Sequence, residues 1–294
     1  MKFSNTNSIL LTLALPLAAL GCRSTHSANG IAGESFASPD EAFEALASVA
    51  RQGSMEDFEC VLGVDCELSV EPEEEEIFIE DVDSFLALYD EAHHIEKPDS
   101  THALLVVGET DWPFPIPVVQ RGGAWSFDVA AGREEIAARQ IGEDELTAIE
   151  VCRAIGDAQE EYRAEFGHYA TRIISSEGTH DGLYWESADS EPQSPIGVFL
   201  ADAAVEDDHM PEDGDCVPFM GYYFRLLEQP SEGEEAGYAV LAWPAEYGTT
   251  GVMSFAMDDR GVVLETDLGD ETMHACCKTF RFYEPNQEWG VCAD

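Results

Sequence analysis

The stretch LTAIEVCRAIGDAQEEYRAEFGHYA, residues 146–170, decides the fold of the second half of this chain. One set of its positions recurs at spacings of three and four residues, which predicts one face of an amphipathic helix. This set is Leu146, Ile149, Cys152, Ile155, Gln159, Tyr162 and Phe166. Gly167 comes directly after it, and a glycine at this place commonly ends a helix.

Four segments with strand character follow this helix. They cover residues 221–227, 238–243, 252–257 and 262–267. The last two are joined by Asp258-Asp259-Arg260-Gly261, which is typical of a tight hairpin connection. Before them, Ser194-Pro195 predicts a short helix that continues to Ala204. One helix laid on a four-stranded antiparallel sheet buries a sizeable core in about 120 residues.

The first half of the chain opens with a helix start. Ser38-Pro39-Asp40-Glu41 provides an N-cap, a proline in the first turn and a capping-box glutamate. A second helical pattern covers residues 82–94 and ends at His93-His94. Paired histidines at a helix C-terminus more often complement the helix dipole than bind a ligand, and the first interpretation is preferred.

Strand patterns come next. The first is the apolar run 103–108, and the second covers 111–119, with prolines at positions 113, 115 and 117. Alternate residues of a strand point their N–H groups to the same edge. These prolines therefore predict an outer strand with one edge closed to neighbours. The residues that alternate with them, and that are expected to be buried together, are Trp112, Phe114, Ile116 and Val118.

Gly122-Gly123 then turns the chain into a partner strand with Trp125, Phe127 and Val129 on one face. Helices followed by an antiparallel meander predict the α+β class. The pattern is similar to the cone-shaped sheet-and-helix fold of nuclear-transport-factor-like proteins. The expected parts are a signal peptide at 1–21, a flexible tether at 22–35, α+β domains at 36–141 and 142–270, and a cysteine-containing tail at 271–294.

The first residues are typical of a bacterial lipoprotein signal. Lys2 precedes the apolar run 9–20, which ends in Ala19-Leu20-Gly21-Cys22. The run is too short to span a bilayer of roughly 30 Å as a helix, but it suits a signal peptide. We expect Cys22 to be lipidated, with plain secretion or an uncleaved anchor as alternatives. Arg23 after the cysteine slightly favours the outer membrane, on the periplasmic side.

Charge excludes several partners. The chain has 14 Lys and Arg residues against 60 Asp and Glu residues, which gives a formal net charge of -46. Such a surface repels nucleic acid and anionic lipid headgroups. The hydrophobic fraction of 45% argues against disorder. Two interpretations of the acidity remain: adaptation to high salt, or a surface that binds cations or a basic partner.

The cysteine count bears on disulfides. There are 8 cysteines, so lipidation of Cys22 leaves an odd number in an oxidising compartment. Cys60 and Cys66 flank a short turn, and we expect a local disulfide between them.

A second disulfide is expected in the tail, from Cys276 or Cys277 to Cys292. Because His274 lies close to Cys276 and Cys277 in the sequence, a metal site is the alternative interpretation of these cysteines. Since the sequence has no second arm with metal-ligand spacing, we predict no metal and no cofactor.

Five motifs occur together in this chain. They are DWPFPIP at 111–117, GLYW at 182–185, PQSPIG at 192–197, GYYFR at 221–225 and WPAEYGTTGVM at 243–253. With them the chain resembles the bacterial envelope family catalogued as domain of unknown function 2950, over about residues 38–269. The resemblance implies no reaction and no catalytic residues. The tail from Thr272, the Cys60/Cys66 pair and the strong acidity depart from it.

Residues 145–267 are also similar to the globular head of type IV pilins and pseudopilins, which place one helix on a four-stranded meander. No prepilin leader or apolar helix precedes this segment. A head without that helix cannot pack into a filament core. We therefore expect a borrowed module that serves as a rigid binding surface.

Motifs of known chemistry are missing from the sequence. It contains no Gly-x-Ser-x-Gly, no phosphate-binding glycine loop and no His-Glu-x-x-His. The segment 212–215 is calcium-like in composition but lacks the ligand spacing, so a solvated loop is preferred. Several aromatic residues either line a pocket or pack in a core, and core packing is preferred. They are Trp112, Phe114, Trp125, Tyr184 and Trp185.

The expected function is therefore that of a non-catalytic, lipid-anchored envelope protein. It is expected to bind an envelope protein or a small ligand, and to contact the membrane through its lipid. The alternative is an extracytoplasmic hydrolase with a site in the first domain, where His93, His94 or His102 works beside a carboxylate.

Overall fold

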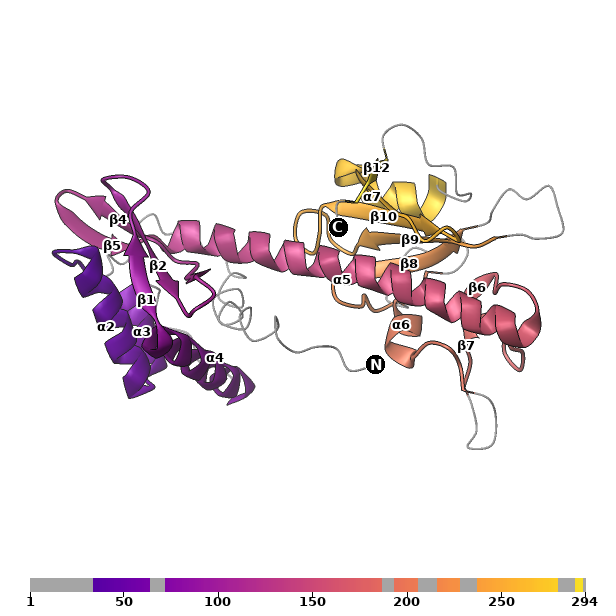
Figure 1. Ribbon diagram of the computed structural model, residues 1–294, viewed down its shortest axis with the longest axis horizontal. Coiled ribbons are helices and arrows are strands. Elements are labelled where there is room, and N and C mark those ends of the chain that lie inside the picture. The colour runs from indigo at the N-terminus through magenta and orange to yellow at the C-terminus, as the bar shows by residue number, and fades with distance from the viewer. Residues whose placement is uncertain are drawn as a thin grey trace. The chain divides into compact units, whose positions relative to one another are not determined.

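The computed structural model describes residues 34–63, 72–186, 193–205, 216–227, 237–279 and 289–292. Helices and mostly antiparallel strands form these parts of the chain, which confirms the α+β class. The chain divides into two compact units, and the division falls between Arg139 and Gln140. Figure 1 shows the helices and strands of both units.

Helix α2 (Pro39–Gln52) begins as the sequence predicts. The backbone N–H of Glu41 donates to Ser38 Oγ at 3.1 Å, and the Glu41 carboxylate accepts from the N–H of Ala37 at 2.8 Å. The pattern is that of a capping box, except that the glutamate accepts from the residue before the N-cap. The helix ends at Gly53, whose φ of 68° lies in the left-handed region that favours glycine.

Two further helices and a strand complete this part: α3 (Met55–Leu62), α4 (Pro72–Glu91) and β1 (His93–Glu96). The prediction that a helix ends at His93-His94 is wrong, because both histidines lie in β1. They pair there with Val107 and Val106 of the neighbouring strand. Backbone pairing thus replaces the last helical turn. His93 Nδ1 nevertheless lies 2.7 Å from the Tyr89 carbonyl in the last turn of α4, so this side chain still contacts the C-terminus of the helix.

The sheet of the first unit has the order β1-β2-β4-β5, with β3 paired to β2. Its other strands are β2 (His102–Val107), β3 (Trp112–Pro113), β4 (Val118–Arg121) and β5 (Ala124–Phe127). The single outer strand predicted over 111–119 is wrong. Its prolines split the segment into two short strands, since proline has no N–H for a ladder. Moreover, β4 is internal and pairs with both β2 and β5.

The burial predicted for the proline-rich segment is largely present. Phe114, Ile116 and Val118 are buried, while Trp112 is half-buried against the same core. The Phe127 ring packs edge-on against Phe43, with 5.6 Å between ring centroids. The prolines therefore shorten the strands without changing which side chains form the core.

Helix α5 (Val129–Phe166) starts far earlier than the sequence stripe indicates. Val129 is in this helix and not in the predicted partner strand. Asp128 caps the helix start, because its carboxylate accepts from the N–H of Ala131 at 3.3 Å. Leu146, predicted to be on the buried face, is 66% exposed, whereas Cys152 is fully buried.

The four predicted strands of the second unit are all present, and a fifth joins them. The sheet is antiparallel, in the order β12-β11-β10-β9-β8. Its strands are β8 (Tyr222–Leu227), β9 (Ala239–Pro244), β10 (Met253–Asp258), β11 (Val263–Asp267) and β12 (Gly290–Val291). Figure 1 shows α5 crossing one side of this sheet.

Both faces of this sheet are covered. Phe224, Ala242 and Phe255 belong to the core shared with α5, and Leu241 and Trp243 belong to a second core on the other face. Alternate side chains along a strand point to opposite faces, so β8, β9 and β10 each contribute residues to both cores. This explains why every described residue of β9 is buried.

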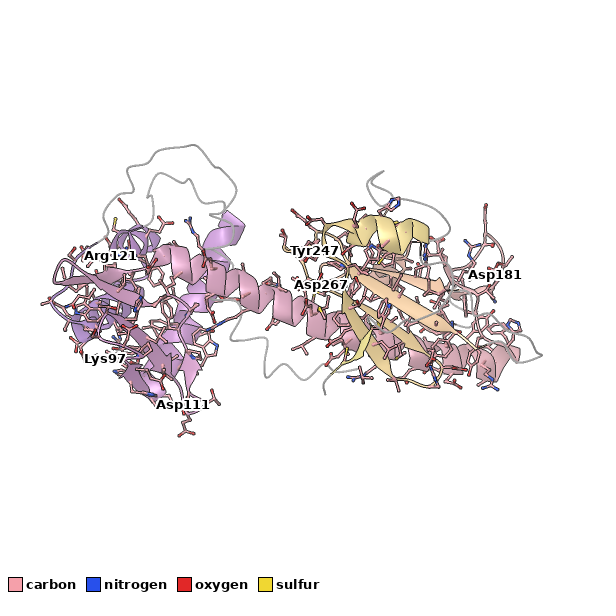
Figure 2. All side chains as sticks on the ribbon, turned by 90° about the horizontal axis from the view of Figure 1, so that it is seen from above. Lys97, Asp111, Arg121, Asp181, Tyr247 and Asp267 are labelled. Carbon is pink, nitrogen blue, oxygen red and sulfur yellow. The ribbon has the colours of Figure 1, made fainter. Side chains whose placement is uncertain are left out.

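Part of the predicted tail packs onto the second face through Met273, Cys276 and Cys277. It contains the 3₁₀ turn η4 (Gly269–Glu271), the short helix α7 (Thr272–His274) and the wide turn η5 (Ala275–Thr279). Nearby, Tyr247 Oη donates to the Asp267 carboxylate at 3.1 Å, which ties the turn after β9 to the end of β11 (Figure 2).

Smaller elements precede this sheet. Strands β6 (Arg172–Ile174) and β7 (Gly182–Tyr184) form a two-stranded parallel pair, and α6 (Val198–Asp202) follows them. After α6, the chain runs along the outer side of β8. There the N–H of Val205 donates to the Phe224 carbonyl at 2.8 Å. Among the described residues, no helix combines the length and apolar character needed to cross a membrane.

Candidate functional site

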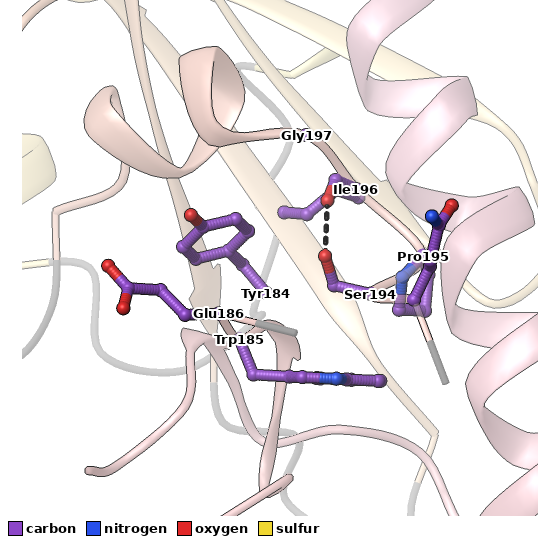
Figure 3. A pocket seen from close by; sticks show the side chains of 8 residues that line it. Tyr184, Trp185, Glu186, Ser194, Pro195, Ile196 and Gly197 are labelled. Carbon is purple, nitrogen blue, oxygen red and sulfur yellow. Dashed lines mark hydrogen bonds between the residues drawn. The ribbon is translucent and has the colours of Figure 1, made fainter. Parts of the chain in front are cut away.

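A groove of about 610 Å³ lies in the second unit (Figure 3). Two separate segments line it, one at the end of β7 and one directly before α6. The lining residues are Tyr184, Trp185, Glu186, Gln193, Ser194, Pro195, Ile196 and Gly197. The groove thus joins two of the sequence motifs, GLYW and PQSPIG.

A close approach of two strands places the first wall. The N–H of Ser175 donates to the Tyr184 carbonyl at 2.8 Å, and the N–H of Gly182 donates to Ser175 Oγ at 3.0 Å. A Cβ at Gly182 would lie 2.7 Å from the Ser175 nitrogen. Glycine is therefore required at the start of the GLYW motif, where another backbone passes against it.

The second wall is tied to the first through the main chain. The N–H of Ile196 donates to the Leu183 carbonyl at 3.4 Å. Within this wall, Ser194 Oγ donates to the Ile196 carbonyl at 2.8 Å, as the dashed line in Figure 3 marks. These contacts hold Ser194 and Ile196, two described residues of the PQSPIG motif, beside β7.

Trp185 has a structural and a lining role. Its ring stacks on the His180 ring at 4.5 Å between centroids, and the Phe166 ring meets it edge-on at 6.2 Å. Trp185 is only 6% exposed, whereas Tyr184 is half-buried. The alternatives of pocket and core packing are therefore both realised at Trp185, and aromatic packing fixes its ring.

The loop between β6 and β7 is held by a carboxylate, labelled in Figure 2. Asp181 accepts from Thr179 Oγ1 at 2.7 Å, from the Ser176 N–H at 2.7 Å and from Ser176 Oγ at 2.9 Å. These hydrogen bonds, above all that from Thr179, lower the pKa of Asp181 to about 2. In addition, Tyr162 Oη donates to the His180 carbonyl at 2.6 Å. The β6–β7 loop is thus held by Asp181 from within and by Tyr162 of α5 from outside.

The other predicted pocket aromatics lie elsewhere. Trp112, Phe114 and Trp125 belong to the core of the first unit and do not line the groove. Core packing is therefore the role that the structure gives to these three residues. The lining residues that the sequence analysis did not name as site candidates are Glu186 and five residues of the PQSPIG motif: Gln193, Ser194, Pro195, Ile196 and Gly197.

The histidines of the hydrolase alternative lie in the first unit, outside the groove. His93 stacks on the Tyr89 ring at 3.8 Å between centroids. His102 contacts the Asp99 carboxylate through Nδ1 at 2.9 Å. The N–H of Thr101, followed by the His102 side chain, lowers the pKa of Asp99 well below its usual range. This contact orients the His102 ring at an exposed turn.

Metal-binding groups do not gather in the part of the chain that the structure describes. No group of three or more His, Cys, Asp or Glu side chains lies close enough there to hold an ion. The predicted lipidation site Cys22, the disulfide partner Cys66 and the acidic segment 212–215 fall outside the described residues.

The predicted disulfide from Cys276 or Cys277 to Cys292 is absent, and all three are free cysteines in the structure. Cys276 and Cys277 are buried in the core on the face that α7 covers, while Cys292 packs against the core on the α5 face. The sheet separates them, and side chains on opposite faces of a sheet cannot meet. Cys60 is exposed at the end region of α3.

A protein-family model described as "Protein of unknown function (DUF2950)" matches residues 33–292. The chain therefore belongs to this family, as the motifs indicated. The match extends over the cysteine-containing segment and the Cys60/Cys66 region, which had been interpreted as departures. No curated protein and no solved structure matches the chain, so the two fold likenesses remain predictions.

Proposed function

We propose that this member of the family is a non-catalytic, lipid-anchored envelope protein that binds a ligand in the groove beside Tyr184 and Trp185. The observation that carries the proposal is the construction of the groove. Main-chain hydrogen bonds fix both of its walls, and ring contacts with Phe166 and His180 fix the buried Trp185. Such preorganisation favours binding, because little conformational entropy is lost when a ligand enters.

The lining argues for binding more than for acyl transfer. Ser194 is the hydroxyl that a hydrolase of this kind would use as a nucleophile. Its Oγ instead donates to the Ile196 carbonyl, and no histidine is among the residues that line the groove. A serine without an adjacent base is a weak nucleophile.

The chemistry of the ligand follows from the same lining. Tyr184 and Trp185 offer aromatic surface, while Glu186 and Gln193 offer a carboxylate and an amide for hydrogen bonds. The net charge of -46 disfavours anions. We therefore expect a neutral or cationic ligand with one apolar face and several hydrogen-bonding groups.

Site-specific crosslinking tests the groove in cells that make the protein. A photoreactive phenylalanine analogue in place of Gln193, at the groove, is expected to give a covalent adduct that mass spectrometry identifies. The same analogue in place of Asp259, which is exposed on the β10–β11 hairpin, is the matched control. Equal adducts at both positions, or none at position 193, would contradict the proposal.

The lipid anchor has its own test. Cells fed an alkynyl fatty acid are expected to label the wild-type protein, and the protein should sediment with membranes. Cys22→Ser is expected to abolish the label, because serine has no thiol to acylate. A wild-type protein that stays unlabelled and soluble after export would support plain secretion instead.

A further inference from the structure

The last strand brings a cysteine to the face of the sheet that α5 covers. Strand β12 pairs with β11 so that Val291 lies opposite Leu264, and the N–H of Cys292 donates to the Val263 carbonyl at 3.1 Å. Cys292 is therefore the neighbour of Val263. Residues opposite each other on antiparallel strands place their side chains on the same face. Since Val263 belongs to the core beneath α5, Cys292 faces that helix.

A second cysteine faces it from the helix. Cys152 lies on α5, is fully buried, and belongs to the same core against which Cys292 packs. Burial, followed by the nearby Cys292, raises the pKa of the Cys152 thiol to about 12. Burial also raises the pKa of Cys292 to about 12, and its thiol donates to the Glu265 carboxylate at 3.3 Å. Both cysteines thus contact the same core from two elements, Cys152 from α5 and Cys292 from the end of β12.

We propose that Cys152 and Cys292 form a disulfide in the oxidised protein, which ties helix α5 to the last strand of the sheet. The other described cysteines of this unit are excluded as partners of Cys292 by their position. Cys216, Cys276 and Cys277 belong to the core on the opposite face. This pairing replaces the one that sequence spacing suggested.

The reaction is a thiol–disulfide exchange with a protein or small-molecule disulfide as the oxidant. In the folding chain, before either sulfur atom is buried, the Cys292 thiolate attacks the oxidant's disulfide and releases one thiolate from it. The Cys152 thiolate then attacks the mixed disulfide, forms the Cys152–Cys292 bond and releases the second thiolate. Two protein thiols are oxidised, one oxidant disulfide is reduced to two thiols, and the two protons pass to these products.

The same burial fixes when the bond forms. Only a thiolate attacks a disulfide, and thiols with a pKa of about 12 are almost entirely protonated at neutral pH. Oxidation of the folded, reduced protein is therefore expected to be slow. The bond is expected to form while the chain folds, before α5 and β12 bury both sulfur atoms.

Peptide mapping tests the bond without assuming where the protein works. The mature full-length protein is reduced, unfolded, and refolded with a mixture of oxidised and reduced glutathione. Remaining thiols are then alkylated, and the protein is digested without reduction. The expected result is one crosslinked peptide pair that contains positions 152 and 292. Alkylation of both residues, or a bond from Cys292 to another cysteine, would overturn the proposal.

Stability gives an independent readout. The proposed bond closes a long loop, so reduction is expected to lower the melting temperature of the second unit by about 10 °C. Cys292→Ser should melt like the reduced wild type and should not respond to reductant. Cys276→Ser, which changes a buried cysteine of the other core, is the control and should keep the response. A response lost in the control and kept in Cys292→Ser would also overturn the proposal.

Discussion

Gly251→Ala is expected to lower the free energy of unfolding of the second unit by about 3 kcal/mol. An added Cβ would collide with Tyr222 Oη and would lie 2.7 Å from its Cζ. Tyr222 is fully buried, and its Oη donates to the Met253 carbonyl at 2.8 Å. The ring therefore has no room to retreat without losing this hydrogen bond.

The surroundings of Tyr222 make the clash costly. Its backbone is paired with Pro244 in β9, and its ring packs on that of Phe255 at 5.9 Å between centroids. Burial, followed by the charges of Glu145 and Asp144, raises the pKa of Tyr222 far above its usual range, so the hydroxyl stays neutral. A forced move of this ring would disturb two strands at once, because interiors are close-packed.

Gly248→Ala is the matched control in the same turn. Gly248 has a φ of 75°, and a Cβ there meets nothing within 4 Å. Its substitution carries the cost of a left-handed backbone alone, about 1 kcal/mol. Hydrogen exchange of the β8–β10 amides measures both variants in the second unit by itself. Equal losses in the two variants would show that the Tyr222 contact does not limit this position.

Gln159→Leu is expected to cost roughly 2–4 kcal/mol, although leucine has a similar volume and is apolar. The Gln159 side chain is fully buried on α5. Its Nε2 donates to the Ala170 carbonyl at 3.0 Å, and its Oε1 accepts from the Ala170 N–H at 2.8 Å. Leucine would leave both backbone groups of Ala170 unpaired inside the protein, which is expensive.

This substitution is also expected to loosen the groove. Ala170 precedes β6, and β6 pairs with the strand that carries Tyr184. Amides of β6 and β7 should therefore exchange faster than those of β9 in the variant. Gln140→Leu, at a half-buried glutamine whose Nε2 donates to the Asp144 side chain at 2.9 Å, is the control and should cost under about 1 kcal/mol. A loss at Gln159 no larger than that at Gln140 would contradict the argument.

Four strands of the sheet in the second unit could be predicted from sequence, because turn residues separate segments of strand character. The fifth strand, β12, could not, since it has only two residues and both are exposed. The start of α5 could not be predicted. The apolar stripe begins only where the helix reaches the core that it shares with the sheet of the second unit. Residues 129–145 form the same helix without that signal, and Leu146 satisfies the spacing yet is exposed. Periodicity reports which face is covered and not how far a helix extends.

The proline-rich segment shows a different limit. Its alternation of apolar side chains correctly predicted the burial of Phe114, Ile116 and Val118. The same alternation suggested one strand, but ladder pairing depends on N–H groups that proline lacks. Side-chain patterns thus predicted the core here, whereas the hydrogen bonds decided the strand boundaries.

The groove depends on contacts that spacing cannot reveal. The PQSPIG motif was noted in the sequence without a role. The contact that places its Ile196 is a hydrogen bond to the main-chain carbonyl of Leu183, which sequence spacing does not reveal. The predicted disulfide from Cys276 or Cys277 to Cys292 was wrong for a related reason. The three residues are near each other in sequence, but they lie on opposite faces of the sheet. Both features could be recognised only once the register of β6 with β7 and of β11 with β12 was known.

The backbone that flanks β8 has a consequence for recognition. Strand β8 pairs with β9 on one side, and on the other side the Phe224 N–H and carbonyl bond to Ala203 and Val205. At the far end of the sheet, β12 contributes only Gly290–Val291. Exposed strand edges invite extra strands from other chains. Here one edge is occupied at Phe224, and at the other edge the described strand has only two residues. Strand addition by another chain and sheet-to-sheet aggregation are therefore disfavoured at these edges.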